Sequence, residues 1–457
     1  MKAVYHWFAL VVSSLGLGLS GWIVIPAPTF LLLPLSVGAP EVSPWLLGLN
    51  ALGALLSFGG ASSKKSLNSK SLNQKVVNQK TVNQKTGNQT TSGLLSRVAL
   101  GLSVVGALLC LLPFSQLSAT NQRAIAAMAQ GLGSDYLAKV PLAVQAQMRS
   151  QPFVLTESLG GIPELTVRYT PGISFKKIPK PAPEGVEVIS EATPEAIPEA
   201  TPEAIPETIS DDAPLTLDLY RPPQVGQYPA LVVIYGGAWQ TGSPLSNADF
   251  SRYMAARGYV VWAISYRHAP RYQFPTQLED VEDALSFLRT HAAEYETDPD
   301  RVALLGRSAG AQLAMLAAYR PGAPPIKAVV DYYGPVDLAE GYYNPPSPSP
   351  IDTRMVLTAL LGGAPSDFPQ RYASASPINF VSGSAPPTLL VYGGRDNVVQ
   401  SKYGRAMHKR LLAAGNQAVF LEIPWADHAF DSVFNGISNQ LALYYTERFL
   451  AWALLVP

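Results

Sequence analysis

Cysteine, charge and histidine are all scarce in this chain of 457 residues. Its single cysteine, Cys110, excludes an internal disulfide framework and any metal site built from several cysteines. Charged side chains make up only 14% of the residues, against roughly a quarter in an ordinary soluble domain. Because 33 basic residues balance 33 acidic ones, the chain lacks the basic excess of a nucleic-acid-binding protein, and we expect no such partner. Low charge with 47% hydrophobic residues indicates that part of the chain lies in a membrane.

Three apolar stretches crowd residues 1–114, which we interpret as a membrane region with two or three transmembrane helices. The runs Tyr5–Ile25 and Leu94–Leu112 supply the about 20 apolar residues that one crossing needs. The middle stretch, Thr29–Phe58, is broken by three prolines and an acid. It predicts either one span beginning at Pro44 or a longer, kinked one. A cleaved signal peptide is the alternative for the first stretch, but its length and the spans after it favour a retained helix.

A lysine repeat separates the second and third stretches. In the loop of residues 61–93, lysine recurs every five residues from Lys65 to Lys85, and no acid occurs between Ala61 and Arg97. Such low complexity, rich in Asn and Gln, predicts a disordered spacer. Short Lys-rich loops stay on the cytoplasmic side of a membrane. We therefore expect a multi-pass membrane protein whose C-terminal domain lies on the extracytoplasmic side.

Two connecting segments follow. Residues 115–150, rich in Ala, Gln and Leu, predict a helical stalk near the membrane. Residues 179–213 carry a Pro/Glu repeat of period four, in which proline prevents a helix and the acids repel one another. We interpret this repeat as a solvated spacer, with an acidic binding surface as the alternative. It lies between the strand-like runs Leu165–Tyr169 and Leu215–Tyr220, which predicts an insertion in a hairpin at the domain edge.

Residues 151–457 predict one domain of the α/β class. Short continuous apolar runs alternate with amphipathic helical patterns, which indicates a mostly parallel sheet with helices on both faces. The predicted strands are Ala230–Tyr235, Tyr259–Ser265, Val302–Gly306, Ile326–Tyr332, Thr388–Tyr392 and Ala418–Ile423. The predicted helices include Gln277–His291, Ala309–Tyr319 and Ser401–Ala414.

One motif in this domain predicts a nucleophilic serine. Gly306-Arg307-Ser308-Ala309-Gly310 follows a predicted strand and opens a predicted helix, which is the context of a nucleophile elbow. The tight turn requires small flanking residues and exposes the serine oxygen. A bare G-x-S-x-G pattern is weak, but its position between a strand and a helix makes it specific.

The serine needs a base and an orienting carboxylate. Among the five histidines, only His428 follows Ser308 in a loop directly after a strand. Asp396 follows the strand Thr388–Tyr392, and so it lies at the same sheet edge and is our candidate for the acid. Three other acids remain as alternatives: Asp427 and Asp431 by proximity in sequence, and Asp337 after another strand. A purely structural role is the alternative for His428.

A glycine pair supplies candidate donors for an oxyanion. Gly236 and Gly237 follow the strand Ala230–Ile234, and their backbone N–H groups, with that of Ala309, predict an oxyanion hole. A plain Gly-Gly turn is the alternative. Three side chains beside these motifs, Tyr235, Trp239 and Arg307, are candidates for lining the substrate pocket.

Together these residues resemble the α/β-hydrolase superfamily, in the esterase/lipase branch that includes hormone-sensitive-lipase-like and feruloyl-esterase-like enzymes. The resemblance covers about Leu215 to Leu454. Within this range, the runs Ser265–Pro270 and Leu278–Val281 also resemble sequences of that branch. The family carries histidine before the paired glycines, whereas this chain has Tyr235. The Tyr-Gly-Gly-Ala-Trp run on a membrane-anchored chain is also similar to isoprenylcysteine methylesterases.

The sequence therefore predicts a membrane-anchored serine hydrolase that cleaves carboxylic esters through a Ser308–His428–Asp396 triad and an acyl-enzyme intermediate. We expect no metal and no organic cofactor, a small-molecule or lipid-like ester substrate, and contact with the lipid bilayer. Residues 335–380, rich in Pro and Ser, are expected to form a cap over the site. The alternatives are an amidase or peptidase of the same fold, and a non-catalytic binding or envelope interaction protein. The sequence predicts neither the oligomeric state nor the natural substrate.

Overall fold

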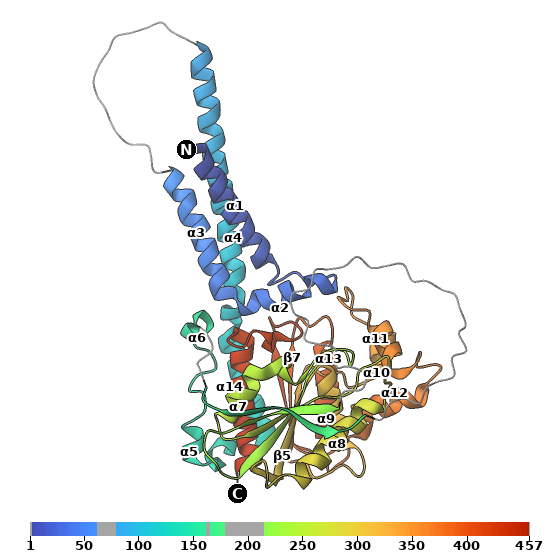
Figure 1. The fold of residues 1–457 in the computed structure, drawn as a ribbon. Coiled ribbons are helices and arrows are strands. Elements are labelled where there is room, and N and C mark those ends of the chain that lie inside the picture. The colour runs from blue at the N-terminus through green and yellow to red at the C-terminus, as the bar shows by residue number, and fades with distance from the viewer. Residues whose placement is uncertain (1, 62–78, 161–164, 179–213, 457) are drawn as a thin grey trace.

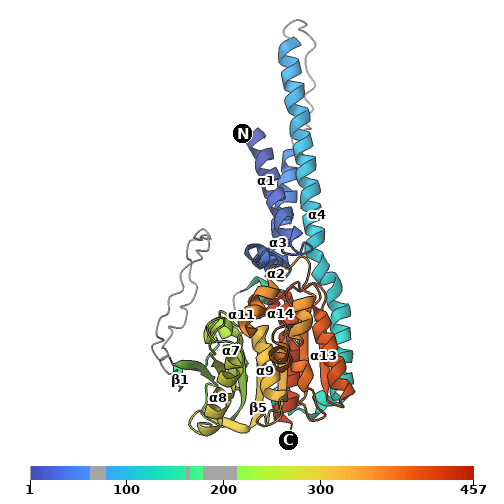
Figure 2. The ribbon, with the colours of Figure 1, turned by 90° about the vertical axis from the view of Figure 1, so that its right-hand side faces the viewer.

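The computed structural model describes residues 2–61, 79–160, 165–178 and 214–456. Three long helices rise side by side from an α/β domain (Figures 1 and 2). They are α1 (Lys2–Gly21), α3 (Ser43–Ala61) and α4 (Gln79–Leu132). The Pro/Glu repeat of residues 179–213 and the first part of the lysine repeat, residues 62–78, lie outside the described residues.

Two of the described helices are long and apolar enough to cross a membrane, within Val4–Gly21 and Gly93–Leu132. The middle stretch is broken: η1 (Phe30–Leu32) and α2 (Leu33–Glu41) run at 83° to α3, and this bent pair would count as a third span. The part of this stretch from Ser43 onward forms α3, and the part before it forms the segment bent away from α3. In both views α2 lies across the foot of the bundle, on top of the α/β domain (Figures 1 and 2).

The interior of the bundle is built from small and polar residues. Asn50 donates to Ser20 Oγ at 2.8 Å and to the carbonyl of Leu46 at 2.9 Å. A Cβ on Gly106 would overlap the Asn50 side chain, so the backbones of α3 and α4 approach closely at this level. Close contact through glycine and serine, with large apolar side chains facing outward, is typical of helices packed in a bilayer.

The expectation of a disordered lysine repeat is wrong for its second part. Helix α4 begins at Gln79, so residues 79–93 continue the apolar helix outward. Extending an existing helix costs far less than starting one, and this part of the repeat contains no proline.

The expected stalk, residues 115–150, is also not a separate element. Helix α4 passes through Pro113 and continues to Leu132, with Ala124, Met128 and Leu132 buried in the main core of the domain. This Ala- and Leu-rich segment has an apolar face, and it buries that face against the sheet instead of leaving it in solvent. Short helices follow it: η2 (Tyr136–Lys139), α5 (Leu142–Gln145) and α6 (Leu155–Leu159).

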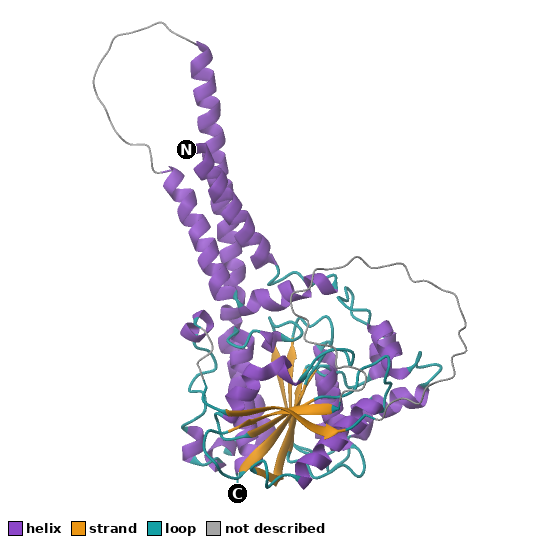
Figure 3. Ribbon diagram, viewed as in Figure 1, coloured by secondary structure: helices purple, strands orange, loops and turns teal. Residues whose placement is uncertain are grey.

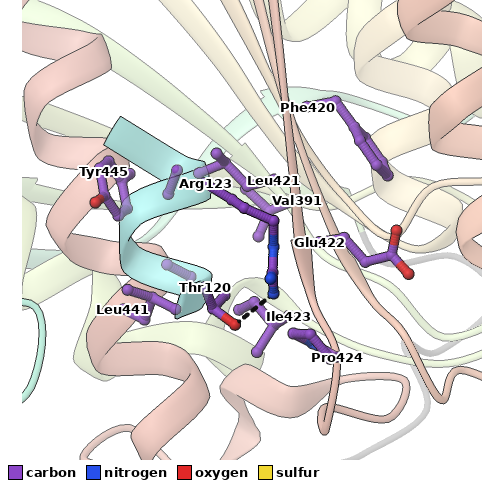
Figure 4. A pocket seen from close by; sticks show the side chains of 12 residues that line it. Thr120, Arg123, Val391, Phe420, Leu421, Glu422, Ile423, Pro424, Leu441 and Tyr445 are labelled. Carbon is purple, nitrogen blue, oxygen red and sulfur yellow. Dashed lines mark hydrogen bonds between the residues drawn. The ribbon is translucent and has the colours of Figure 1, made fainter. Parts of the chain in front are cut away.

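A cavity of about 380 Å³ remains between α4, α14 (Ile437–Leu455) and the last strand, Ala418–Ile423. The Arg123 side chain extends along it and donates to Thr120 Oγ1 at 2.8 Å (Figure 4). Apolar side chains, Val391, Leu421 and Leu441 among them, form much of the remaining wall.

The domain is built on one eight-stranded sheet in the order β1-β2-β4-β3-β5-β6-β7-β8. Its strands lie at the centre of the domain, between helices (Figure 3). The strands are β1 (Arg168–Lys176), β2 (Leu215–Arg221), β3 (Tyr228–Ile234), β4 (Val260–Ile264), β5 (Thr297–Arg307), β6 (Ala328–Tyr332), β7 (Thr388–Gly393) and β8 (Ala418–Ile423). Strands β1 and β2 pair antiparallel at one edge, and β3 to β8 are parallel. The predicted α/β class with a mostly parallel sheet is confirmed.

Helices cover both faces of the sheet. One face carries α7 (Ala248–Ala255), α14 (Ile437–Leu455) and the end of α4, and the other carries α8 (Thr276–Thr290), α9 (Ala309–Tyr319) and α13 (Ser401–Ala413) (Figures 1 and 2). Residues 335–380 form α10 (Leu338–Tyr343), α11 (Thr353–Leu361), α12 (Pro369–Ala375) and η4 (Pro377–Phe380). Two short 3-10 helices complete the described domain, η3 (Pro244–Asn247) and η5 (Phe430–Ser432).

The first predicted strand, Leu165–Tyr169, lies too early in the chain. Strand β1 begins at Arg168 and continues to Lys176 through Pro171 and Gly172. Its register against β2 shifts between Thr170 and Ile173. An edge strand tolerates proline and glycine at a bulge, which allows β1 to continue past Pro171 and Gly172.

Four parallel strands end at the edge that faces the helical bundle. The chain leaves β3, β5, β7 and β8 there just before Gly236, Ser308, Asp396 and His428. The Arg395 guanidinium donates to the carbonyl of Ile23 at the foot of the bundle. Glu41 of α2 accepts the backbone N–H of Ser438 at 2.8 Å. The candidate site thus lies between the sheet and the segment that joins α1 to α3.

Candidate active site

Ser308 occupies a strained turn between β5 and α9. Its backbone has φ +51° and ψ −120°, a conformation that L-residues rarely adopt. The turn is closed by the hydrogen bond from Ser308 N to the carbonyl of Tyr332, at 2.9 Å. A Cβ on Gly306 or Gly310 would overlap neighbouring backbone atoms, which explains why both flanking positions are glycine. This geometry is that of a nucleophile elbow.

The imidazole of His428 contacts the serine. Its Nε2 atom lies 3.0 Å from Ser308 Oγ, within hydrogen-bond reach for a proton transfer. His428 belongs to the loop after β8, where the next residue, Ala429, has φ +55°. The ring of Tyr333 packs edge-on against the imidazole, with ring centroids 4.7 Å apart.

Asp396 binds the other side of the imidazole. Its Oδ2 lies 2.8 Å from His428 Nδ1, and its Oδ1 accepts the backbone N–H groups of Val398 and Val399 at 2.8 and 2.7 Å. Each carboxylate oxygen therefore has a fixed partner. With Nδ1–H donating to the carboxylate, Nε2 carries the lone pair that faces Ser308.

The three alternative acids make other contacts. Asp427 accepts the backbone N–H of His428 at 2.7 Å and does not reach its ring. Asp431 forms a buried ion pair with Arg307 and accepts the hydroxyl of Tyr333. Asp337 caps α10 by accepting the N–H of Glu340 at 3.0 Å. Of the four, Asp396 alone holds the Nδ1 atom.

Burial and charge act in opposite directions on the base. Burial disfavours the charged imidazolium of His428, but the carboxylate of Asp396, supported by Asp427 and Asp431, outweighs burial. The pKa of His428 is therefore raised above its ordinary value of 6.5.

The glycine pair Gly236 and Gly237 lies close to Ser308. A Cβ on Gly236 would stand 2.9 Å from the carbonyl oxygen of Arg307 and 3.1 Å from the Cβ of Ser308, so a larger residue would have to displace the backbone here. Gly237 has φ +127°, and the next two residues, Ala238 and Trp239, have φ +54° and +59°. Ala309 is the first residue of α9, where backbone N–H groups have no partner within the helix.

Two of the three candidate pocket residues line the pocket. Trp239 does so while its Nε1 donates to Gln312 at 3.0 Å, and Arg307 does so beside Asp431. The assignment of Tyr235 to the pocket is wrong. Its ring stacks on Tyr266, with centroids 4.5 Å apart, and its hydroxyl lies 3.0 Å from His268 Nε2. Tyr235 therefore packs against Tyr266 and His268, and no pattern in the sequence connects it with His268.

The pocket above Ser308 has a volume of about 730 Å³, within the usual range for ligand sites. Helices α10 and α11 supply apolar lining, including Leu338, Met355 and Val356. Phe30 and Leu33, from the segment between α1 and α3, line the same pocket. Neither residue could be predicted from the sequence, because no pattern connects residue 30 with a serine that follows far along the chain.

The serine elbow, the base at the same edge and the mostly parallel sheet define a domain of the α/β-hydrolase class. Residues 217–411 match the BD-FAE family. This match and the fold support placing the α/β domain in the esterase branch of the α/β-hydrolase superfamily.

Named relatives agree with this placement. The chain is 33% identical over 258 residues to the probable carboxylic ester hydrolase LipM of Mycobacterium tuberculosis, covering 51% of this chain and 57% of that protein. It is 36% identical over 99 residues to a probable isoprenylcysteine alpha-carbonyl methylesterase of Arabidopsis thaliana, covering 21% of each. The chain therefore spans little more than half of LipM, and far less of the methylesterase.

Among solved structures, an esterase from Thermogutta terrifontis is similar at 24% identity with a TM-score of 0.46, covering 55% of this chain and 92% of that one.

Proposed function

We propose that this protein is a membrane-anchored serine esterase that hydrolyses carboxylic esters through an acyl-enzyme. The observation that carries the proposal is the continuous contact from Ser308 through His428 to Asp396, with distances of 3.0 and 2.8 Å. Kinship with carboxylic ester hydrolases supports the choice of an ester as substrate.

In the first half-reaction, Ser308 Oγ attacks the ester carbonyl carbon while His428 Nε2 takes the hydroxyl proton. The carbonyl oxygen becomes an oxyanion, which the N–H groups of Gly236, Gly237 and Ala309 stabilise. Collapse of this intermediate breaks the bond to the alcohol oxygen, and the imidazolium returns the proton to that oxygen. The alcohol leaves and an ester between the acyl group and Ser308 remains.

In the second half-reaction, water replaces the alcohol. His428 accepts a proton from water as its oxygen attacks the acyl carbonyl, and the same donors hold the second oxyanion. Breakage of the bond to Ser308 Oγ releases the carboxylic acid, and His428 reprotonates the serine. Asp396 remains ionised throughout and stabilises the imidazolium in both halves.

The membrane anchor in this proposal consists of α1, the bent pair α2–α3, and α4 up to about Pro113. The described ends that flank residues 62–78, Ala61 of α3 and Gln79 of α4, lie at the end of the bundle opposite the α/β domain (Figure 1). Since Lys-rich loops remain cytoplasmic, the hydrolase domain lies on the extracytoplasmic side. The outward-facing apolar side chains of the bundle support contact with lipid; they include Trp7, Phe8, Val11 and Leu55.

The test is Ser308→Ala in the full chain, assayed with short p-nitrophenyl esters and a fluorophosphonate probe. We expect labelling to disappear and kcat to fall by a factor on the order of 10⁶, as for other triad serines. Ser382→Ala is the matched control, since Ser382 is an exposed serine that is hydrogen-bonded to Ser384. This variant should keep both the probe labelling and the kcat of the wild type. Full ester turnover by Ser308→Ala would refute the proposal, and turnover of a matched amide at the same rate would favour an amidase.

A further inference from the structure

The pocket above Ser308 is completed by the membrane region. Phe30 of η1 and Leu33 of α2 line it together with Ser308, His428 and Trp239. The segment that carries them is anchored to the domain: Glu41 accepts Ser438 N–H, and Trp45 Nε1 donates to the carbonyl of Ser158 at 3.1 Å. The rim formed by η1 and α2 is therefore a fixed wall of the site.

This rim lies where the bundle leaves the hydrocarbon layer. Helix α1 has 20 residues, and at about 1.5 Å per residue it spans roughly the 30 Å of a hydrocarbon core. It ends at Gly21, shortly before η1, and α3 begins at Ser43, directly after α2. Since α2 runs at 83° to α3, it lies close to the plane of a bilayer that the bundle crosses. The pocket thus has one wall at the level of the membrane surface.

The outer side of the rim is apolar. Phe30 is 70% exposed and Leu31 is 84% exposed, and Leu35 and Val24, which are near them in the sequence, are also exposed. A patch of this kind next to apolar helices is unfavourable in water and favourable against acyl chains. Phe30 contributes to both surfaces, because it lines the pocket and is exposed outside it.

We propose that the substrate is a bilayer-resident lipid ester, which reaches Ser308 sideways from the outer leaflet past Phe30. The proposal rests on the esterase function above and adds the class and source of the substrate. The acyl chain leaves the leaflet at the exposed face of Phe30 and follows the apolar side of the pocket along Leu33, Met355 and Val356 to the serine. The ester carbonyl then lies at the polar end, beside Gly236 and His428.

The experiment uses the full chain in phosphatidylcholine nanodiscs with two substrates. One is soluble p-nitrophenyl butyrate, and the other is dioleoylglycerol embedded in the same bilayer. The wild type should release oleate, and Phe30→Asp should lower the ratio of the dioleoylglycerol rate to the butyrate rate at least tenfold. Val225→Asp is the matched control. This apolar residue is 81% exposed, and it lies in the loop between β2 and β3, at the end where β3 begins and therefore away from the site, which lies where β3 ends. In Val225→Asp the ratio of the dioleoylglycerol rate to the butyrate rate should equal that of the wild type.

Two results would overturn the proposal while leaving the esterase function intact. One is hydrolysis of p-nitrophenyl butyrate that depends on Ser308 without any release of oleate by the wild type. The other is an unchanged ratio in Phe30→Asp. Absence of Ser308-dependent turnover of both substrates would instead refute the esterase function itself.

Discussion

Asp396 fixes His428 with one carboxylate oxygen and is itself fixed by the other. The Oδ2–Nδ1 distance is 2.8 Å, while Oδ1 accepts two backbone N–H groups of its own loop. Asp396→Asn should therefore keep the fold but allow the wrong imidazole tautomer, which removes the lone pair from Nε2. We expect kcat to fall by a factor of about 10⁴, measured with p-nitrophenyl butyrate.

Asp427→Asn is the matched control for this prediction. Asp427 is adjacent to His428 and buried, yet it contacts only the backbone of that residue. We expect a loss of less than about tenfold, because the ring keeps its partner. Equal losses in the two variants would show that Asp396 is not the orienting carboxylate.

The raised pKa of His428 predicts the acid limb of the pH profile. His428 acts as a base only when neutral, so kcat/KM falls as the pH falls through the pKa of the free enzyme. Because Asp396 and its acidic neighbours raise this pKa against the effect of burial, the midpoint should lie above 6.5. In Asp396→Asn the residual activity should show a midpoint at lower pH. A wild-type midpoint well below 6.5 would contradict the electrostatic account.

The contact of Ser308, His428 and Asp396 could be predicted from sequence because each residue follows a strand of one parallel sheet. The order of strand and helix patterns alone places the three residues at a common sheet edge. The pocket wall could not be predicted in this way. Phe30 meets the site only because the bundle is docked on the domain through contacts such as Glu41 with Ser438. Such contacts between distant segments leave no periodic pattern in the chain.

The Arg307–Asp431 ion pair is buried, with both side chains 3% exposed. Asp431→Ala would leave the Arg307 guanidinium without its carboxylate, and we expect a loss of about 3 to 5 kcal/mol in stability. Thermal unfolding of the full chain in detergent measures this. Glu422→Ala is the comparison, since the Arg405–Glu422 pair is much more exposed; that variant should lose at most about 1 kcal/mol.

Two predictions for residues of α4 are wrong because the structure of these residues depends on neighbouring segments. The lysine repeat looked disordered on composition, but residues 79–93 extend a helix that the apolar segment has already formed. The stalk looked independent because the position of β8 and α14 beside Met128 is not visible in the sequence. Both errors concern segments whose structure depends on a neighbour.

Two glycines on α4 provide a matched test of packing in the bundle. A Cβ on Gly106 would overlap the amide of Asn50, whereas a Cβ on Gly101 would meet no atom within 4 Å. Gly106→Ala should destabilise the protein by about 1 to 3 kcal/mol through overpacking. Gly101→Ala should be neutral or stabilising by up to about 1 kcal/mol, because alanine favours a helix. Apparent melting temperatures in detergent measure both, and equal shifts would argue against the close approach of α3 and α4.

The sidedness of the domain can be tested with single cysteines. The background variant is Cys110→Ser, which removes the one native thiol. In this background, Val225→Cys places a thiol on the exposed surface of the domain. Lys75→Cys places one in the lysine repeat. Since Lys-rich loops stay in the cytoplasm, a membrane-impermeant maleimide should label Val225→Cys in intact spheroplasts. It should label Lys75→Cys only after permeabilisation. The reverse pattern would place the domain in the cytoplasm and, with it, move the source of any lipid substrate to the inner leaflet.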